Sequence, residues 1–265
     1  MAFNNLTTLI ILSIVSQWGH CCLSDKNMSI LLTVIVSTFL AGLAMPLGAV
    51  LAYVEKIGND WLEQELRHSV MAFGGGALLS AVALVLVPEG IESLDILPAC
   101  IWFIVGGFSF MALDIYLKKI DTPASQLAAM LADFIPESIA LGAAFATGSS
   151  SAYLLAGLIA LQNLPEGFSA YRELSASSTY KPQKIIMVFA LMAILGPIAA
   201  ISGYLWLSES PKIIGAVMLF ASGGILYSIF QDLAPQVKLE NHWAPPMGAV
   251  LGFTLGMLGL MLTAT

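Results

Sequence analysis

The sequence has few charged residues, few cysteines and few histidines. Only 10% of its 265 residues are charged, whereas 58% are hydrophobic, and a typical soluble domain has about 25% charged residues. This composition excludes an ordinary soluble domain and predicts a polytopic membrane protein. The three cysteines, Cys21, Cys22 and Cys100, match neither a CxxC nor a Cys/His spacing, which argues against a thiolate zinc site or a disulfide framework. The sequence has no basic patch, so we expect no nucleic-acid partner.

Motifs of membrane-embedded hydrolases are missing as well. The patterns GxGD, HExxH and GxSxG do not occur, and the histidines at 20, 68 and 242 lie outside the spans predicted below. We therefore expect no enzyme and no cofactor. One alternative stays open, an intramembrane hydrolase that uses Asp114 and Asp133 as a general acid and base.

Apolar runs of about 20 residues, the length that crosses a hydrocarbon core of about 30 Å, recur eight times. We predict a single all-α bundle over residues 29–265, preceded by an N-terminal segment at 1–28. The apolar run at 6–19 in that segment is either the core of a signal peptide or an additional N-terminal segment. The predicted spans are 29–53, 69–88, 97–117, 124–147, 152–172, 185–207, 213–235 and 245–264.

The distribution of Lys and Arg predicts the orientation, because cytoplasmic loops carry an excess of both. Loops after odd-numbered spans hold eight of them, and the other side holds only Lys26 and Lys212. Both termini are therefore expected outside, in an integral multi-pass protein of the plasma (inner) membrane. Glycines at 248, 252 and 256 form a small-xxx-small ladder that predicts close helix packing, and a homodimer is one compatible assembly. The eight Lys and Arg residues in the loops after odd-numbered spans are Lys56, Arg67, Lys118, Lys119, Arg172, Lys181, Lys184 and Lys238.

Two neighbouring spans place carboxylates at membrane depth, where a charge costs at least about 2.5–3.5 kcal/mol. Asp133 and Glu137 lie four residues apart on one predicted helix and share a face. Gln162 and Glu166 repeat this spacing on the next helix. If the two faces meet, they gather three carboxylates and an amide oxygen, which low dielectric tolerates only with a bound cation or protons.

A proline accompanies each of these pairs. Pro136 and Pro165 lack the amide proton that would bond the carbonyls of Ala132 and Leu161, so we expect a helix kink at both. Irregular backbone at membrane depth is tolerated where it lines a cavity. Two such prolines, each followed by Glu and preceded by a polar residue at the same offset, favour one shared site.

The run from Gln162 to Gly167, QNLPEG, resembles the fifth-helix signature of the ZIP family of divalent-metal transporters, in its GufA-like branch. Supporting likeness occurs at 72–77 with 87–92, and at 221–224 with 233–235. The resemblance implies an eight-helix transporter with both termini outside. It also implies a metal site made of Asp133, Glu137, Gln162, Asn163 and Glu166.

The chain departs from the family pattern in the fourth span. Asp133-Phe134 stands where the family usually has His-Asn, and Ser138 replaces the usual glycine. A carboxylate in place of an imidazole makes the ligand set harder. The substitution therefore favours manganese, ferrous iron or magnesium over zinc.

Further departures lie in the sixth and seventh spans. Gly196, before Pro197, stands where the family often has a glutamate that bridges two metals. With that glutamate and the asparagine missing, we expect one bound ion rather than a pair. Gln231 and Asp232 stand where many members have His or Glu, and Asp232 and Glu89 are candidates for the inner and outer ends of a pathway.

We therefore expect a transporter that moves a divalent cation of the zinc, manganese or iron class into the cytoplasm through a carboxylate-rich site in mid-membrane. The cation is its substrate, and the lipid bilayer is its surroundings. A second alternative is a ZIP-derived membrane protein that no longer transports, with Asp133, Phe134 and Gly196 as signs of lost function.

Overall fold

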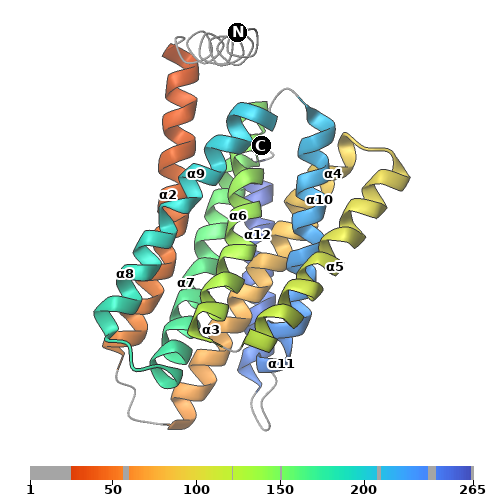
Figure 1. Ribbon diagram of the computed structural model, residues 1–265. Coiled ribbons are helices and arrows are strands. Elements are labelled where there is room, and N and C mark those ends of the chain that lie inside the picture. Colours follow the sequence, from red (N-terminus) through yellow and green to blue (C-terminus); the bar gives the residue numbers. More distant parts are fainter. Residues whose placement is uncertain are drawn as a thin grey trace, which may run out of the picture.

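The computed structural model of the chain describes residues 25–55, 60–120, 122–149, 151–207, 210–237 and 243–263, and all the regular structure in these ranges is helical (Figure 1). Seven helical segments in them are long and apolar enough to cross a membrane. The prediction of an all-α, multi-pass membrane protein is thereby confirmed. Most of the N-terminal segment at 1–28 lies outside the described residues. The seven segments are Met28–Val54, Gln64–Glu92, Ile96–Ile120, Leu127–Thr147, Pro182–Leu205, Pro211–Leu233 and Ala244–Thr263.

The fifth predicted span corresponds to α7, which has 26 residues but is not one of these seven segments. Its middle carries Gln162, Asn163 and Glu166, which lower its hydropathy. The helices are α2 (Asp25–Val54), α3 (Asp60–Ala81), α4 (Val87–Glu92), α5 (Ile96–Ile120), α6 (Pro123–Thr147), α7 (Ala152–Ser177), α8 (Pro182–Ala193), α9 (Leu195–Ser202), α10 (Pro211–Ser228), α11 (Ala234–Val237) and α12 (Ala244–Thr263), with π-helical turns η1 (Val82–Leu86), η2 (Gly203–Leu207) and η3 (Ile229–Leu233).

Two of the π-helical turns end two residues before a proline. Pro88 follows η1 and Pro235 follows η3; because proline has no amide proton, the carbonyl four residues earlier lacks its usual partner. By contrast, the helical assignment of α6 and α7 continues without interruption through Pro136 and Pro165. The widened turns thus lie at prolines other than the two that the sequence singled out.

Among the described residues, four pairs of helices approach each other at glycines, one on each partner. A Cβ atom added at any of these glycines would overlap the backbone of the facing helix, so only glycine fits. The facing residues are Gly48 and Leu164 with Gly167 and Met45 (α2 and α7); Gly76 and Ala249 with Gly252 and Phe73 (α3 and α12); Gly106 and Phe220 with Gly223 and Phe103 (α5 and α10); and Gly142 and Ala200 with Gly203 and Ile139 (α6 with α9 and η2).

The glycine ladder of α12 packs as predicted. Cβ atoms at Gly248, Gly252 and Gly256 would meet Ser69, Phe73 and Ser80 of α3 respectively. The start of α2 and the end of α12 lie toward the same end of the bundle (Figure 1).

One histidine lies elsewhere than expected. His68 falls inside the segment Gln64–Glu92, where it is 8% exposed and its Nδ1 lies 2.6 Å from the carbonyl oxygen of Gln64. The expectation that it lies outside the spans is therefore wrong. Its place is explained by the i, i+4 contact, which satisfies the ring nitrogen within the helix itself. The histidines at 20 and 242 lie outside the described residues.

Candidate cation-binding site

A cavity of about 530 Å³ lies between α3, α5, α6, α7, α10 and η3. Its lining extends from Gln162 in the middle of α7 to Ser177 at the end of that helix, where the segments connecting α5 to α6 and α7 to α8 also lie. Carboxylates outnumber ammonium groups in the lining by five to one. They are Asp114, Asp133, Glu166, Glu173 and Asp232, and the ammonium group is that of Lys118.

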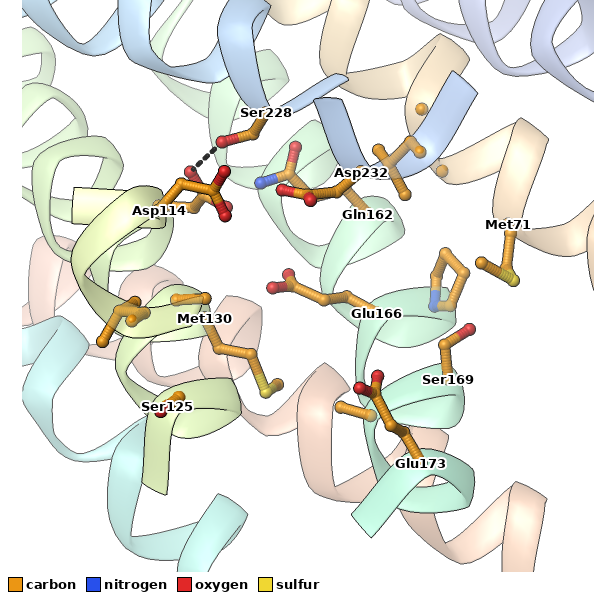
Figure 2. Close-up of a pocket in the computed structure, with 18 of the residues that line it drawn as sticks. Met71, Asp114, Ser125, Met130, Gln162, Glu166, Ser169, Glu173, Ser228 and Asp232 are labelled. Carbon is orange, nitrogen blue, oxygen red and sulfur yellow. Dashed lines mark hydrogen bonds between the residues drawn. The ribbon is translucent and has the colours of Figure 1, made fainter. Parts of the chain in front are cut away.

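The inner part of the cavity is built by α6 and α7. Asp133 comes from α6, and Gln162 and Glu166 come from successive turns of α7. The side chain of Glu166 extends into the open centre of the cavity (Figure 2), and the charges of Asp133 and Glu137 act on it. The Ser228 hydroxyl of α10 donates to Oδ1 of Asp133 at 3.4 Å.

Glu137 lies behind Gln162 and does not line the cavity. The two side chains are 1% and 3% exposed, and Nε2 of Gln162 donates to both carboxylate oxygens of Glu137, at 2.7 and 2.6 Å. Oε1 of Gln162 is buried and has no hydrogen-bond partner. A lone buried acceptor costs about 1–3 kcal/mol.

Asn163 belongs to a different interface. Its Nδ2 donates to the carbonyl oxygen of Ala41 in α2 at 2.9 Å, and it is not part of the cavity lining. Its Oδ1 is buried without a hydrogen-bond partner. Of the five expected ligands, the cavity surface therefore contains Asp133, Gln162 and Glu166.

The three carboxylates of the expected site do not converge on one point. In the described part of the chain, no group of three or more His, Cys, Asp or Glu side chains is placed to hold a metal ion. Two physical causes are visible. Like charges repel strongly in a low-dielectric interior, and the amide of Gln162 holds Glu137 on its far side.

The ring of Phe134 fills the space between α2, α6 and α9. This side chain is 1% exposed, and a Cβ atom at Gly196 would lie 2.6 Å from its Cζ. On the other side, a Cβ at Gly42 would lie 2.9 Å from the same atom. Position 196, where the resemblance implies a bridging glutamate, therefore has no room for a side chain while the phenyl ring of Phe134 is present.

The structure also adds polar residues that the sequence reasoning did not select. Ser169, whose buried hydroxyl has no partner, lines the cavity together with Glu173. Both continue the face of α7 that begins with Gln162 and Glu166, at offsets of three and four residues, so this spacing was a signal in the sequence. Tyr227 of α10, by contrast, makes a hydrogen bond to Asp114 of α5. No local sequence pattern predicts this contact between two helices.

Asp114 forms an ion pair with Lys118, at 2.9 Å between Oδ2 and Nζ. The hydroxyl of Tyr227 donates to the same oxygen at 3.1 Å. Of the auxiliary candidates, Asp232 lines the cavity, whereas Gln231 is exposed and does not. Glu89 lies outside the lining; it accepts a hydrogen bond of 2.6 Å from the hydroxyl of Ser149.

No model of a known protein family matches the chain, and comparison with curated proteins gave no significant match.

Proposed function

We propose that the protein is a ZIP-like transporter that moves a divalent metal cation into the cytoplasm. In this proposal α7 crosses the membrane together with the seven apolar segments, which gives eight spans and places both termini outside. The start of α2 and the end of α12 lie toward the same end of the bundle (Figure 1), and this supports an even number of crossings.

One observation carries the proposal. Gln162, whose buried Oε1 has no hydrogen-bond partner, lines a cavity whose lining also contains Asp133 and Glu166. These are three oxygen ligand groups, and a cation supplies both the countercharge for the carboxylates and a partner for the amide. Membrane proteins seldom have ionisable side chains inside the membrane without a functional use for them.

The cargo follows from the ligand types. Carboxylate and amide oxygens without imidazole or thiolate suit manganese and ferrous iron better than zinc. The phenyl ring of Phe134 occupies the space next to Gly196, so the site holds one cation. We propose that the ion enters from outside, binds between α6 and α7, and leaves through the carboxylate-lined cavity as helices move around the site.

The experiment is uptake of labelled manganese into proteoliposomes that contain the purified chain. Glu166→Gln should reduce the initial rate at least about tenfold, because it removes a charge from the centre of the cavity. Glu92→Gln is the matched control, since Glu92 is exposed and outside the cavity lining. Equal rates for Glu166→Gln and the control would refute the proposal.

A second candidate has structural support of its own, a ZIP-derived protein that no longer transports. The lack of a group of three ligands placed to hold a metal, within the described ranges, and the ring of Phe134 both favour it. Metal-dependent stabilisation discriminates between the two. A transport-competent site raises the melting temperature with manganese, iron, zinc, cadmium or magnesium and loses the effect in Glu166→Gln, whereas a site without function responds to none of them.

A further inference from the structure

Lys118 is the one cationic residue of the cavity lining, and it forms an ion pair with Asp114, a carboxylate of the same lining. Its Nζ lies 2.9 Å from Oδ2 of Asp114, and Tyr227 donates to the same oxygen at 3.1 Å. The Lys118 side chain is 57% exposed and that of Asp114 is 19% exposed. The ammonium group therefore belongs to a largely exposed side chain, while the carboxylate that it contacts is mostly buried in the cavity lining.

A second carboxylate lies close to this pair. Asp232 lines the same cavity from η3, and the charges that act on it include those of Asp114 and Lys118. Figure 2 shows Asp114, Asp232 and Ser228 together in the upper part of the view, above Glu166. Two carboxylates that line one cavity can bind a divalent cation together when no positive charge is bound there.

Such a position creates a problem for a transporter. A cation that leaves the inner site passes these carboxylates, and a second stable binding position on the path slows its release. An ammonium group bound to Asp114 removes that position, because it supplies the countercharge from within the chain. The hydroxyl of Tyr227 uses a further lone pair of the same oxygen.

We propose that Lys118 is a tethered counter-cation that prevents the Asp114–Asp232 position from trapping the departing divalent cation, and so permits its release. The inference rests on the proposed function for its physiological meaning, but its binding test does not. It assigns to Lys118 an effect on the number of cations bound and on the rate of their release, beyond a stabilising ion pair.

The test is a titration of the full-length protein in detergent with Mn²⁺, with free Mn²⁺ read by electron paramagnetic resonance. We expect one Mn²⁺ per chain in the wild type, two in Lys118→Met, and one again in Lys118→Met with Asp114→Asn. The second site of Lys118→Met should bind at least about tenfold more tightly than any residual binding at that position in the wild type. In proteoliposomes, Lys118→Met should lower the maximal uptake rate several-fold.

Two controls separate charge from folding. Lys118→Arg retains the positive charge and should keep the wild-type stoichiometry and rate. Lys119→Met removes a neighbouring exposed lysine that does not line the cavity, and should also behave as the wild type.

The outcomes are distinct. One Mn²⁺ per chain in both wild type and Lys118→Met would overturn the role of Lys118 and leave the proposed function standing. If the wild type binds none and Lys118→Met binds one, which Asp114→Asn then removes, the role of Lys118 stands while the proposed inner site fails. No binding in any variant overturns both.

Discussion

Gly196→Ala should destabilise the protein through a single neighbour, the ring of Phe134. The added Cβ would lie 2.6 Å from Cζ and 3.1 Å from Cε1 of that ring, whereas carbon atoms pack best at about 3.5–4.0 Å. The ring must therefore move by about 1 Å. It has little space for this, because α2 closes the opposite side at Gly42.

The magnitude follows from opposing effects. Overpacking of a close-packed site costs about 1–3 kcal/mol, while replacing glycine by alanine within a helix returns about 0.5–1 kcal/mol. We expect a net loss of about 1–2 kcal/mol in the free energy of unfolding. In a Phe134→Ala background, which itself loses about 3–5 kcal/mol, the ring is gone, and Gly196→Ala should range from neutral to stabilising by about 0.5 kcal/mol, because the helical gain is opposed by the carbonyl oxygen of Thr38 at 3.2 Å.

The assay is a double-mutant cycle, with the free energy of unfolding measured by denaturing-detergent titration in mixed micelles. Gly157→Ala is the control, since nothing lies within 4 Å of a Cβ at that exposed helical position. A coupling of about 1 kcal/mol or more between positions 134 and 196 is expected. If Gly196→Ala has the same effect in both backgrounds, the ring is not what excludes a side chain at 196.

Three further predictions concern the cargo, the number of ions and the ion pair between Glu55 and Arg172. Asp133→His should raise zinc uptake relative to manganese in a competition assay, because imidazole favours zinc; an unchanged ratio contradicts the selectivity argument. Phe134→Asn combined with Gly196→Glu should raise the bound cations from one to two per chain by equilibrium dialysis, while Gly196→Glu alone, which meets the ring, should lower stability without adding an ion. Glu55→Gln should lower the free energy of unfolding by about 1–2 kcal/mol, because it removes the carboxylate whose Oε2 lies 2.5 Å from Nη2 of the half-buried Arg172. A denaturation curve indistinguishable from that of the wild type would show that this ion pair contributes nothing to stability.

The helical spans were predictable because hydropathy is a property of the local sequence. The third span, expected at 97–117, is found at Ile96–Ile120, and the seventh, expected at 213–235, is found at Pro211–Leu233. The packing of α12 on α3 was predictable for a similar reason, since glycines four residues apart fall on one face of a helix.

The candidate site was predictable as a set of residues but not as a geometry. The i, i+4 spacing places Gln162 and Glu166 on one face of α7, and both border the cavity. Spacing cannot show that the amide of Gln162 turns toward Glu137, because this depends on side-chain torsions. It also cannot show that Asn163 faces Ala41, 122 residues earlier in the chain.

The sequence shows each departure from the pattern of the ZIP family as a single substitution. It does not show that two of these positions are in contact. Phe134 and Gly196 lie 62 positions apart in the sequence, yet the ring of one fills the space that the other leaves free. A large residue and a small residue at facing positions keep packing constant. Only the three-dimensional arrangement shows that these two residues are in contact and fit each other in size.

The reciprocal glycine contacts have a consequence for how the chain is made. The paired helices are far apart in sequence: α3 ends at Ala81, whereas its partner α12 ends at Thr263. At a synthesis rate of about 5–20 residues per second, the ribosome takes roughly 10–40 s to complete the chain between them. During this interval the face of α3 that packs on α12 lacks that helix, so lipid or the insertion machinery must cover it. Nascent chains that stop before α12 should therefore be targets for membrane quality control, even with all the residues of the cavity already synthesised.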